Sequence, residues 1–204
     1  MSTTIDERPA ATAPPVVPDA RTHVPGEIGI WVFILLDLAT FAALFAAFLH
    51  DRGGDAELYA ASQAKLSQDF GALNTLILLT SSLLVVAGVR GIRAGRLREA
   101  RLALYGAVAC ALAFCVVKVF EWGGKFADDI TPTTNGFWEY YFGLTGIHLF
   151  HLLIGLGVLT FMLRRTRKAQ LTGADVANVE TGASFWHMVD LIWIVIFPLL
   201  YLAH

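Results

Sequence analysis

The chain has 204 residues, of which 56% are apolar and 16% are charged, with a formal net charge of -2. With a mean hydropathy of +0.60, this composition lies far from that of soluble globular domains and indicates a membrane protein without an aqueous active site of its own. The charge leaves no basic surplus for a phosphate backbone, so we expect no nucleic-acid partner. The two cysteines, Cys110 and Cys115, share one apolar run and predict neither a disulfide framework nor a thiolate metal site.

The first 25 residues differ from the rest of the chain. Residues 1–25 hold five of the seven prolines among threonines, alanines and scattered charges. Such a segment cannot bury enough apolar surface to offset the entropy of ordering. We therefore predict a disordered tail here, and a second unit, residues 26–204, that forms a single transmembrane domain.

Five apolar runs follow the tail, and each is close to the ~20 residues that a helix needs to cross ~30 Å of hydrocarbon. The runs are residues 28–49, 72–90, 102–121, 137–163 and 184–203. Barrel strands would alternate in polarity over ~10 residues, and these runs do not alternate. The sequence predicts an all-α membrane protein, a bundle of five transmembrane helices.

The basic residues are distributed unequally between the two sides of this bundle. The tail, the second connection and the fourth connection carry eleven lysines and arginines, whereas the first and third connections carry three, namely Arg52, Lys65 and Lys125. By the positive-inside rule, the N-terminus and the tail are predicted to be cytoplasmic and the C-terminus external.

Ionisable side chains inside the runs are the candidates for function, because a carboxylate at mid-membrane costs ~2.5–3.5 kcal/mol on insertion scales. Asp37 lies near the middle of the first run and needs a partner. His148 and His151 are three residues apart on one helical face, and His187 and Asp190 repeat that spacing, with Glu180 seven residues before His187. A rise of ~1.5 Å per residue places His187, Asp190, Asp37 and His151 within ~6–18 Å of the cytoplasmic side, so the four could meet. We expect a buried carboxylate and imidazole site for protons or lipid, formed by Asp37, His148, His151, Glu180, His187 and Asp190.

Lys118 and Glu121 are also three residues apart, near the external end of the third run. A lysine there can extend its amine to the membrane surface, so we expect a local structural ion pair. The chain has neither H-E-x-x-H nor E-x-x-H, and histidines spaced i, i+3 are a weak metal signal. We predict no metal site.

Two stretches carry a resemblance to a known family. One is Thr-Gly-x-His-x-x-His at residues 145–151, and the other is Trp-His-x-Val-Asp-x-x-Trp at residues 186–193. Leu73-Asn74-Thr75, Ser81-Ser82 and Glu121 precede them in the family's order. The chain resembles subunit III of the haem-copper oxidases, the cytochrome c oxidase subunit 3 family, in its five-helix form.

The resemblance implies a non-catalytic accessory subunit in the cell inner (plasma) membrane, beside catalytic subunit I and with subunit II. It implies haem and copper in those partner subunits and none in this chain. It also implies phospholipid held in a cleft, support for the proton-uptake side of subunit I and slower inactivation of that subunit. The family's buried carboxylate, usually Glu, falls on Asp37, and its histidines fall on His148, His151 and His187; its acidic residue before the last helix falls on Glu180.

Three other interpretations remain open from the residues. Some five-helix members accompany a nitric oxide reductase instead of an oxygen reductase. The buried Asp and His residues could form the relay of a stand-alone proton or solute carrier, although the chain shows no inverted repeat. A b-type cytochrome would bind haem between the fourth and fifth helices.

Overall fold

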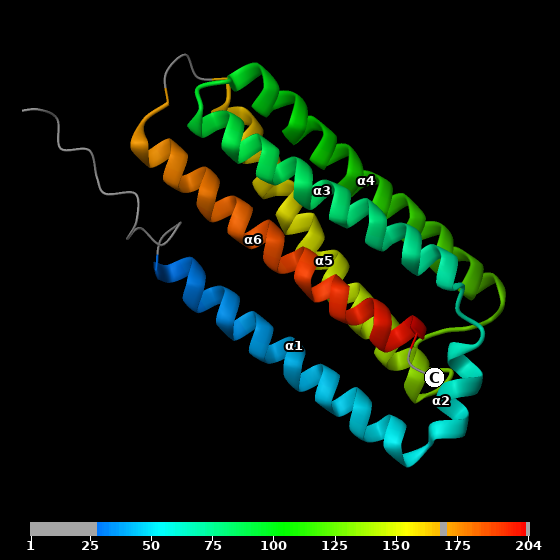
Figure 1. Cartoon of the computed structure of the whole chain (residues 1–204). Helices are drawn as coiled ribbons and strands as arrows, with labels where there is room; N and C mark the ends of the chain where they lie inside the picture. Colours follow the sequence, from blue (N-terminus) through cyan, green and yellow to red (C-terminus); the bar gives the residue numbers. More distant parts are fainter. Residues whose placement is uncertain (1–27, 168–170, 203–204) are drawn as a thin grey trace, which may run out of the picture.

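The computed structural model describes residues 28–167 and 171–202; the predicted tail at residues 1–25 lies outside them. The long helices are α1 (Ile28–Gly54), α3 (Gln68–Arg93), α4 (Leu97–Ala127), α5 (Gly136–Arg165) and α6 (Gly173–Phe197), as Figure 1 shows. A short helix, α2 (Ala56–Gln63), and a π-helical segment, η1 (Pro198–Leu202), complete the described part of the chain.

The five long helices confirm the predicted bundle of five spans, since each is long and apolar enough to cross a membrane. Helices α1, α3, α4 and α5 extend past the apolar runs that predicted them, whereas α6 begins before its run, at Gly173, and gives way at Phe197 to η1. Polar first and last turns, such as Asp69 in α3 and Lys125 in α4, continue the helix beyond the hydrocarbon length. The short helix α2 lies between two spans and was not predicted, because no apolar run coincides with it. Asp55 is its N-cap residue and accepts a hydrogen bond from the Leu58 amide at 3.4 Å.

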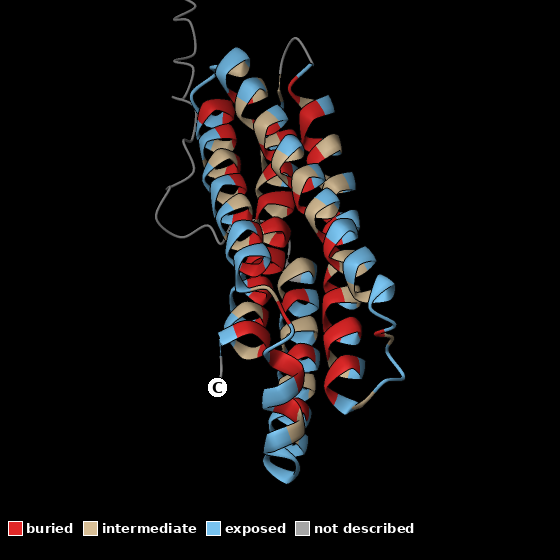
Figure 2. Ribbon diagram, turned by 90° about the vertical axis from the view of Figure 1, so that its right-hand side faces the viewer, coloured by how far each residue is buried: buried red, intermediate tan, exposed pale blue. Residues whose placement is uncertain are grey.

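Helices α3, α4, α5 and α6 pack into a four-helix bundle, and α1 lies along its α5 and α6 side (Figure 1). Buried residues follow the faces that these helices turn toward one another (Figure 2). In the span that contains α6, 56% of the residues in the most apolar 18-residue stretch are buried, against 17% in α1. Helix α6 is therefore the centre of the fold, and α1 is a peripheral helix.

Glycines let the bundle helices approach closely. A Cβ on Gly155 of α5 would lie 2.7 Å from the Trp186 ring of α6, and one on Gly91 of α3 would lie 3.0 Å from the Ala100 Cβ of α4. Helix α3 ends in a tight turn in which Gly95 has a φ of +70°, a conformation that glycine adopts without steric cost.

The basic residues near one end of the bundle define what we call the arginine-rich end. Helices α4 and α6 begin there, and α3 and α5 end there. Its residues are Arg90, Arg93, Arg96, Arg98, Arg101, Arg164, Arg165 and Arg167. The cytoplasmic orientation of this end stays a prediction.

Candidate functional site

Asp37 lies in contact with a histidine, and a partner is expected because an unpaired carboxylate inside a membrane costs free energy. The Nε2 atom of His151 on α5 lies 3.1 Å from Oδ1 of Asp37 on α1, and both side chains are nearly buried. The Phe41 ring packs edge-on against the His151 ring, with centroids 5.7 Å apart, and covers the contact on the α1 side. The expectation that these two residues lie close together is confirmed.

The second ring nitrogen of His151 fixes the proton count of this contact. Its Nδ1 donates to the Ile147 carbonyl at 2.9 Å, so that nitrogen carries a hydrogen. Nε2 can then face the Asp37 carboxyl group favourably only if a proton lies between them, on the imidazole or on the carboxyl group. The Asp37–His151 pair is therefore overall neutral in either state, which suits a site inside a membrane.

His187 and Asp190 form a second, separate pair. The His187 Nδ1 atom lies 2.8 Å from the Ser82 hydroxyl of α3 and 4.0 Å from Asp190 Oδ2. The longer distance exceeds that of a direct hydrogen bond. The four residues expected to meet thus separate into two groups: Asp37 and His151 meet between α1 and α5, whereas His187 and Asp190 both lie on α6, beside Ser82 of α3.

Two adjoining grooves lie around His187, whose side chain is 37% exposed. The first, of about 190 Å³, runs between α3 and α6 and is lined by Arg90, Arg93, Glu180 and apolar residues. The second, of about 310 Å³, runs between α1 and α6. Its walls are Trp31, Ile34, Leu38, Met188 and Leu191. Ser184 and His187 line both grooves.

Glu180 lies on the same face of α6 as His187, as the seven-residue spacing predicts, and both line the first groove. Its partner is not Asp37 or a histidine but Arg93 of α3, whose Nη2 lies 2.7 Å from the Glu180 carboxylate. This ion pair joins α3 to α6 at the arginine-rich end. It leaves Arg90 in the groove without an ion pair to a described residue.

The expected surface position of Lys118 is wrong, although its ion pair with Glu121 is confirmed at 2.9 Å. Lys118 is 0% exposed and Glu121 is 3% exposed, inside the bundle. The lysine stays there because two tyrosines complete its surroundings: Lys118 Nζ donates to the Tyr201 hydroxyl at 2.8 Å, and both Tyr201 and Tyr141 donate to Glu121 Oε1, at 2.6 and 2.8 Å. The aromatic rings of Trp193, Tyr141 and Tyr201 also lie 5.0–5.4 Å from the ammonium group.

His148 does not join His151 at the Asp37 contact. Its ring lies inside the bundle, 5.1 Å from the Trp193 ring and 5.6 Å from the Phe114 ring, and it is fully buried. Although the three-residue spacing places both imidazoles on neighbouring positions of α5, His151 faces α1 and His148 faces α4 and α6.

The sequence reasoning missed Tyr141, Tyr201 and Arg93, the partners of the predicted charged residues. A signal for the buried lysine was present: Leu104, Ala107, Ala111 and Phe114 form the core stripe of α4, and Lys118 continues it at helical spacing. Nothing local to Tyr141 or Tyr201 shows that they converge on one carboxylate from 20 and 80 residues away.

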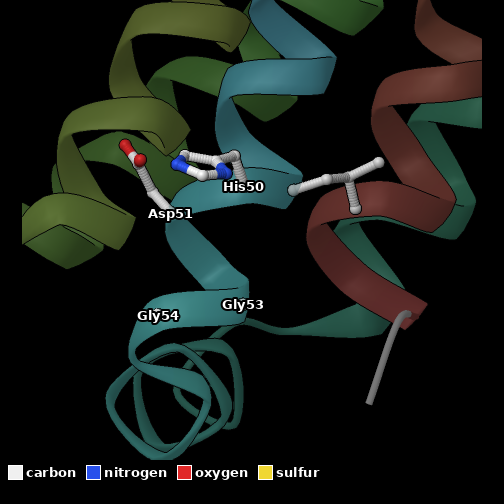
Figure 3. Close-up of a pocket in the computed structure, with 5 residues that line it drawn as sticks. His50, Asp51, Gly53 and Gly54 are labelled. Atoms are coloured by element: carbon white, nitrogen blue, oxygen red, sulfur yellow. The ribbon is translucent and has the colours of Figure 1, made fainter.

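A hollow at the end of α1 away from the arginine-rich end contains His50, Asp51, Gly53 and Gly54 (Figure 3). Asp51 points toward α5, where the Tyr140 hydroxyl donates to it at 2.7 Å. On the neighbouring α2, burial foremost and then the nearby carboxylates raise the pKa of Tyr59. The Asp51–Tyr140 hydrogen bond beside this hollow therefore anchors the end of α1 to α5.

Comparison with known proteins agrees with this geometry. The family model of cytochrome c oxidase subunit III matches residues 23–203. A cytochrome c oxidase subunit 3 of Alkalihalophilus pseudofirmus is 28% identical over 176 residues, which cover 86% of this chain and 85% of the relative. A "Probable quinol oxidase subunit 3" of Staphylococcus haemolyticus is 26% identical over 192 residues, covering 90% and 92%.

A third relative has a different length. The heme-copper oxidase subunit I+III of Aeropyrum pernix is 26% identical over 180 residues, which cover 85% of this chain and 22% of that protein. The family match spans all five long helices, including the Asp37–His151 contact and the buried lysine. The chain belongs to the cytochrome c oxidase subunit III family and is an accessory subunit of a haem-copper oxidase.

Proposed function

We propose that this subunit holds a phospholipid in the two grooves around His187 and, with that lipid, stabilises the catalytic subunit I against inactivation. In this proposal haem and copper belong to subunits I and II, and this chain binds neither. The complex lies in the plasma membrane, in keeping with the bacterial relatives.

The observation that carries the lipid proposal is the continuity of a cationic groove with an apolar one. Arg90 and Arg93 line the first groove, where arginine can bind the phosphate of a headgroup in bidentate geometry. Arg93 is already paired with Glu180, so Arg90 is the arginine available for an anionic group. Trp31, Ile34 and Leu38 then offer an apolar wall for an acyl chain.

The relative from Aeropyrum pernix supports a position beside subunit I, because its name assigns both subunits to one chain. Since two chains that are fused in one organism must fit side by side, we propose that the separate subunit here packs on subunit I in the same way. The cytochrome c and quinol oxidase names of other relatives favour an oxygen-reducing complex over a nitric oxide reductase.

The lipid proposal is tested by purifying the whole oxidase complex and measuring its retained phospholipid by mass spectrometry. Arg90→Gln should lower the amount of anionic phospholipid per complex severalfold, because it removes the unpaired arginine of the groove. Arg98→Gln is the matched control, since Arg98 lies at the same end of the bundle but lines neither groove. Equal retention in both variants would contradict the proposal.

The partner proposal is tested by co-purification from native membranes under mild detergent. Catalytic subunits I and II should be identified by mass spectrometry, and the haem absorption should follow subunit I when the subunits are separated. Recovery of a nitric oxide reductase, or a haem spectrum that stays with this chain alone, would contradict it.

A further inference from the structure

A histidine, an asparagine and an aspartate of the described four-helix bundle are buried without hydrogen bonds, as is the indole N–H of Trp186. Among the described residues, neither ring nitrogen of His148, neither amide atom of Asn74 and neither carboxyl oxygen of Asp190 has a partner within hydrogen-bonding geometry. Their exposed fractions are 0%, 0% and 3%. Because burying such groups unpaired costs roughly 1–3 kcal/mol each, six of these atoms in one core need an explanation.

The three residues are each linked to Trp193, by direct contact, by a neighbouring residue or by helical spacing. The His148 ring lies 5.1 Å from the Trp193 ring. Asn74 directly precedes Thr75, whose hydroxyl accepts a hydrogen bond from Trp193 Nε1 at 3.1 Å. Asp190 lies three residues before Trp193 and therefore on the same side of α6, about one turn away.

Trp193 and these three residues lie between two polar clusters, the Lys118–Glu121 pair and the Ser82–His187 contact. On one side is the Lys118 ammonium group, 5.0 Å from the centre of the Trp193 ring, which the His148 ring also approaches at 5.1 Å. On the other side are Ser82 and His187, and the His187 Nδ1 atom that lies 2.8 Å from the Ser82 hydroxyl is 4.0 Å from Asp190 Oδ2.

We propose that ordered water molecules bind inside the α3–α6 bundle and join His148, Asn74 and Asp190 to one another. A ligand for these side chains must donate hydrogen bonds to the Asp190 carboxyl group and to a His148 ring nitrogen, and it must accept one from the Asn74 amide. Water can both donate and accept. Buried water typically makes two to four hydrogen bonds to groups of this kind. The core of this subunit is then hydrated from the Lys118–Glu121 cluster to Asp190.

This inference goes beyond the proposed function, since it concerns the interior of the bundle and not the lipid grooves. It also gives His187 a second role: its side chain reaches from the Ser82 and Asp190 side of the interior to both grooves, so the hydrated core meets the surface of the subunit there.

A direct test is a cryo-EM map of the complete oxidase complex at a resolution that shows ordered water. Density for water is expected within hydrogen-bonding distance of the His148 ring, the Asn74 amide and the Asp190 carboxyl group. A map in which apolar atoms surround these groups, or in which they bond directly to one another, would overturn the inference.

A second test uses the sign of a stability change in the whole complex. If these groups are dry and unpaired, Asn74→Leu and His148→Phe remove a buried polar penalty and raise the melting temperature of the subunit. If water binds them, both changes break its hydrogen bonds and lower the melting temperature. Thr80→Val is the control, because Thr80 is an exposed residue of α3 that bonds only its own helix at Leu76.

Combining the two core substitutions checks whether the water is shared. The loss in the double variant should be smaller than the sum of the two single losses, since the first change already disrupts the shared water. Strict additivity, or a rise in melting temperature in either single variant, contradicts the inference. Because the lipid grooves are unchanged in these variants, phospholipid retention reports separately on the proposed function.

Discussion

The Oδ1 atom of Asp37 on α1 lies 3.1 Å from Nε2 of His151 on α5, while the other ring nitrogen of His151 donates to the Ile147 carbonyl. Helix α1 is the least enclosed of the five long helices, and a Tyr140 to Asp51 hydrogen bond of 2.7 Å also joins it to α5 near the end of the helix. The Asp37–His151 contact therefore sets how the middle of α1 lies against the bundle, next to the groove that α1 forms with α6.

We expect Asp37→Ala to assemble with its oxidase but to shorten the time for which the complex stays active during turnover. The substitution leaves the His151 nitrogen buried without a partner, at a cost of about 1–3 kcal/mol, and loosens α1. His151→Gln should have a similar effect, and the double variant should be no worse than either single one, because both remove the same contact. Activity is followed through many turnovers of the purified complex.

Thr40→Val is the control for this series. Thr40 lies one turn along α1, is exposed, and donates only to the Leu36 carbonyl of its own helix. It should leave the active lifetime unchanged. Additive losses in Asp37→Ala and His151→Gln would show that the two residues act independently.

The stability of the subunit should depend strongly on both partners of the Lys118–Glu121 pair. Lys118→Met leaves the Glu121 carboxylate buried without its cation, which typically costs about 3–5 kcal/mol of folding free energy. Adding Glu121→Gln should recover much of that loss, since the uncompensated charge is then gone. The thermal unfolding of the subunit in the complex, followed by intrinsic fluorescence, measures both.

Helix α4 carries its own control for this prediction. Arg96 and Glu99 form an ion pair of the same i, i+3 spacing at 3.2 Å, but their side chains are 60% and 64% exposed, against 1% for each partner of the buried pair. Exposed pairs contribute about 0–1 kcal/mol, so Arg96→Gln should change the unfolding temperature little. Equal effects of the two substitutions would contradict the role assigned to burial.

Hydropathy and helical spacing predicted the five helices, because a helix in a membrane must satisfy its own backbone and the length of each apolar run is then decisive. They also predicted that Asp37 needs a partner inside the membrane. They could not separate His148 from His151: a three-residue spacing puts both on one side of α5, and which neighbour each one faces depends on where α1, α4 and α6 pack.

The burial of Lys118 likewise could not be predicted from spacing within one helix. A position near the end of an apolar run favours an exposed lysine, and the alternative needs partners that only the fold supplies. Tyr141 and Tyr201 come from α5 and η1, and the latter segment widens into a π-helix where Pro198 lacks the N–H that a continued α-helix would use. Sequence spacing within α4 contains no information about either tyrosine.

The start of α6 offers a local prediction. The Thr172 hydroxyl accepts a hydrogen bond from the Asp175 amide at 3.2 Å, while the Asp175 carboxylate accepts one from the Thr172 amide at 3.0 Å. Thr172→Ala should lower the stability of the subunit by about 0.5–2 kcal/mol, as loss of a helix cap does. Thr172→Ser keeps the hydroxyl and should unfold at the same temperature as the original protein; a matching loss in both variants would point to the methyl group instead.

The closest approach of α5 to α6 should tolerate no added methyl group. A Cβ at Gly155 would lie 2.7 Å from the Trp186 ring, and that ring is fully buried at the centre of the fold and cannot move aside. Gly155→Ala is therefore expected to cost about 1–3 kcal/mol through overpacking, measured as a lower unfolding temperature of the subunit. Two residues further along α5, Gly157 is exposed and has no atom within 4 Å of an added Cβ. Gly157→Ala should be neutral or stabilising by up to about 1 kcal/mol, because alanine favours the helix. If Gly155→Ala unfolds at the same temperature as Gly157→Ala, then α5 and α6 are not packed as closely as this geometry requires.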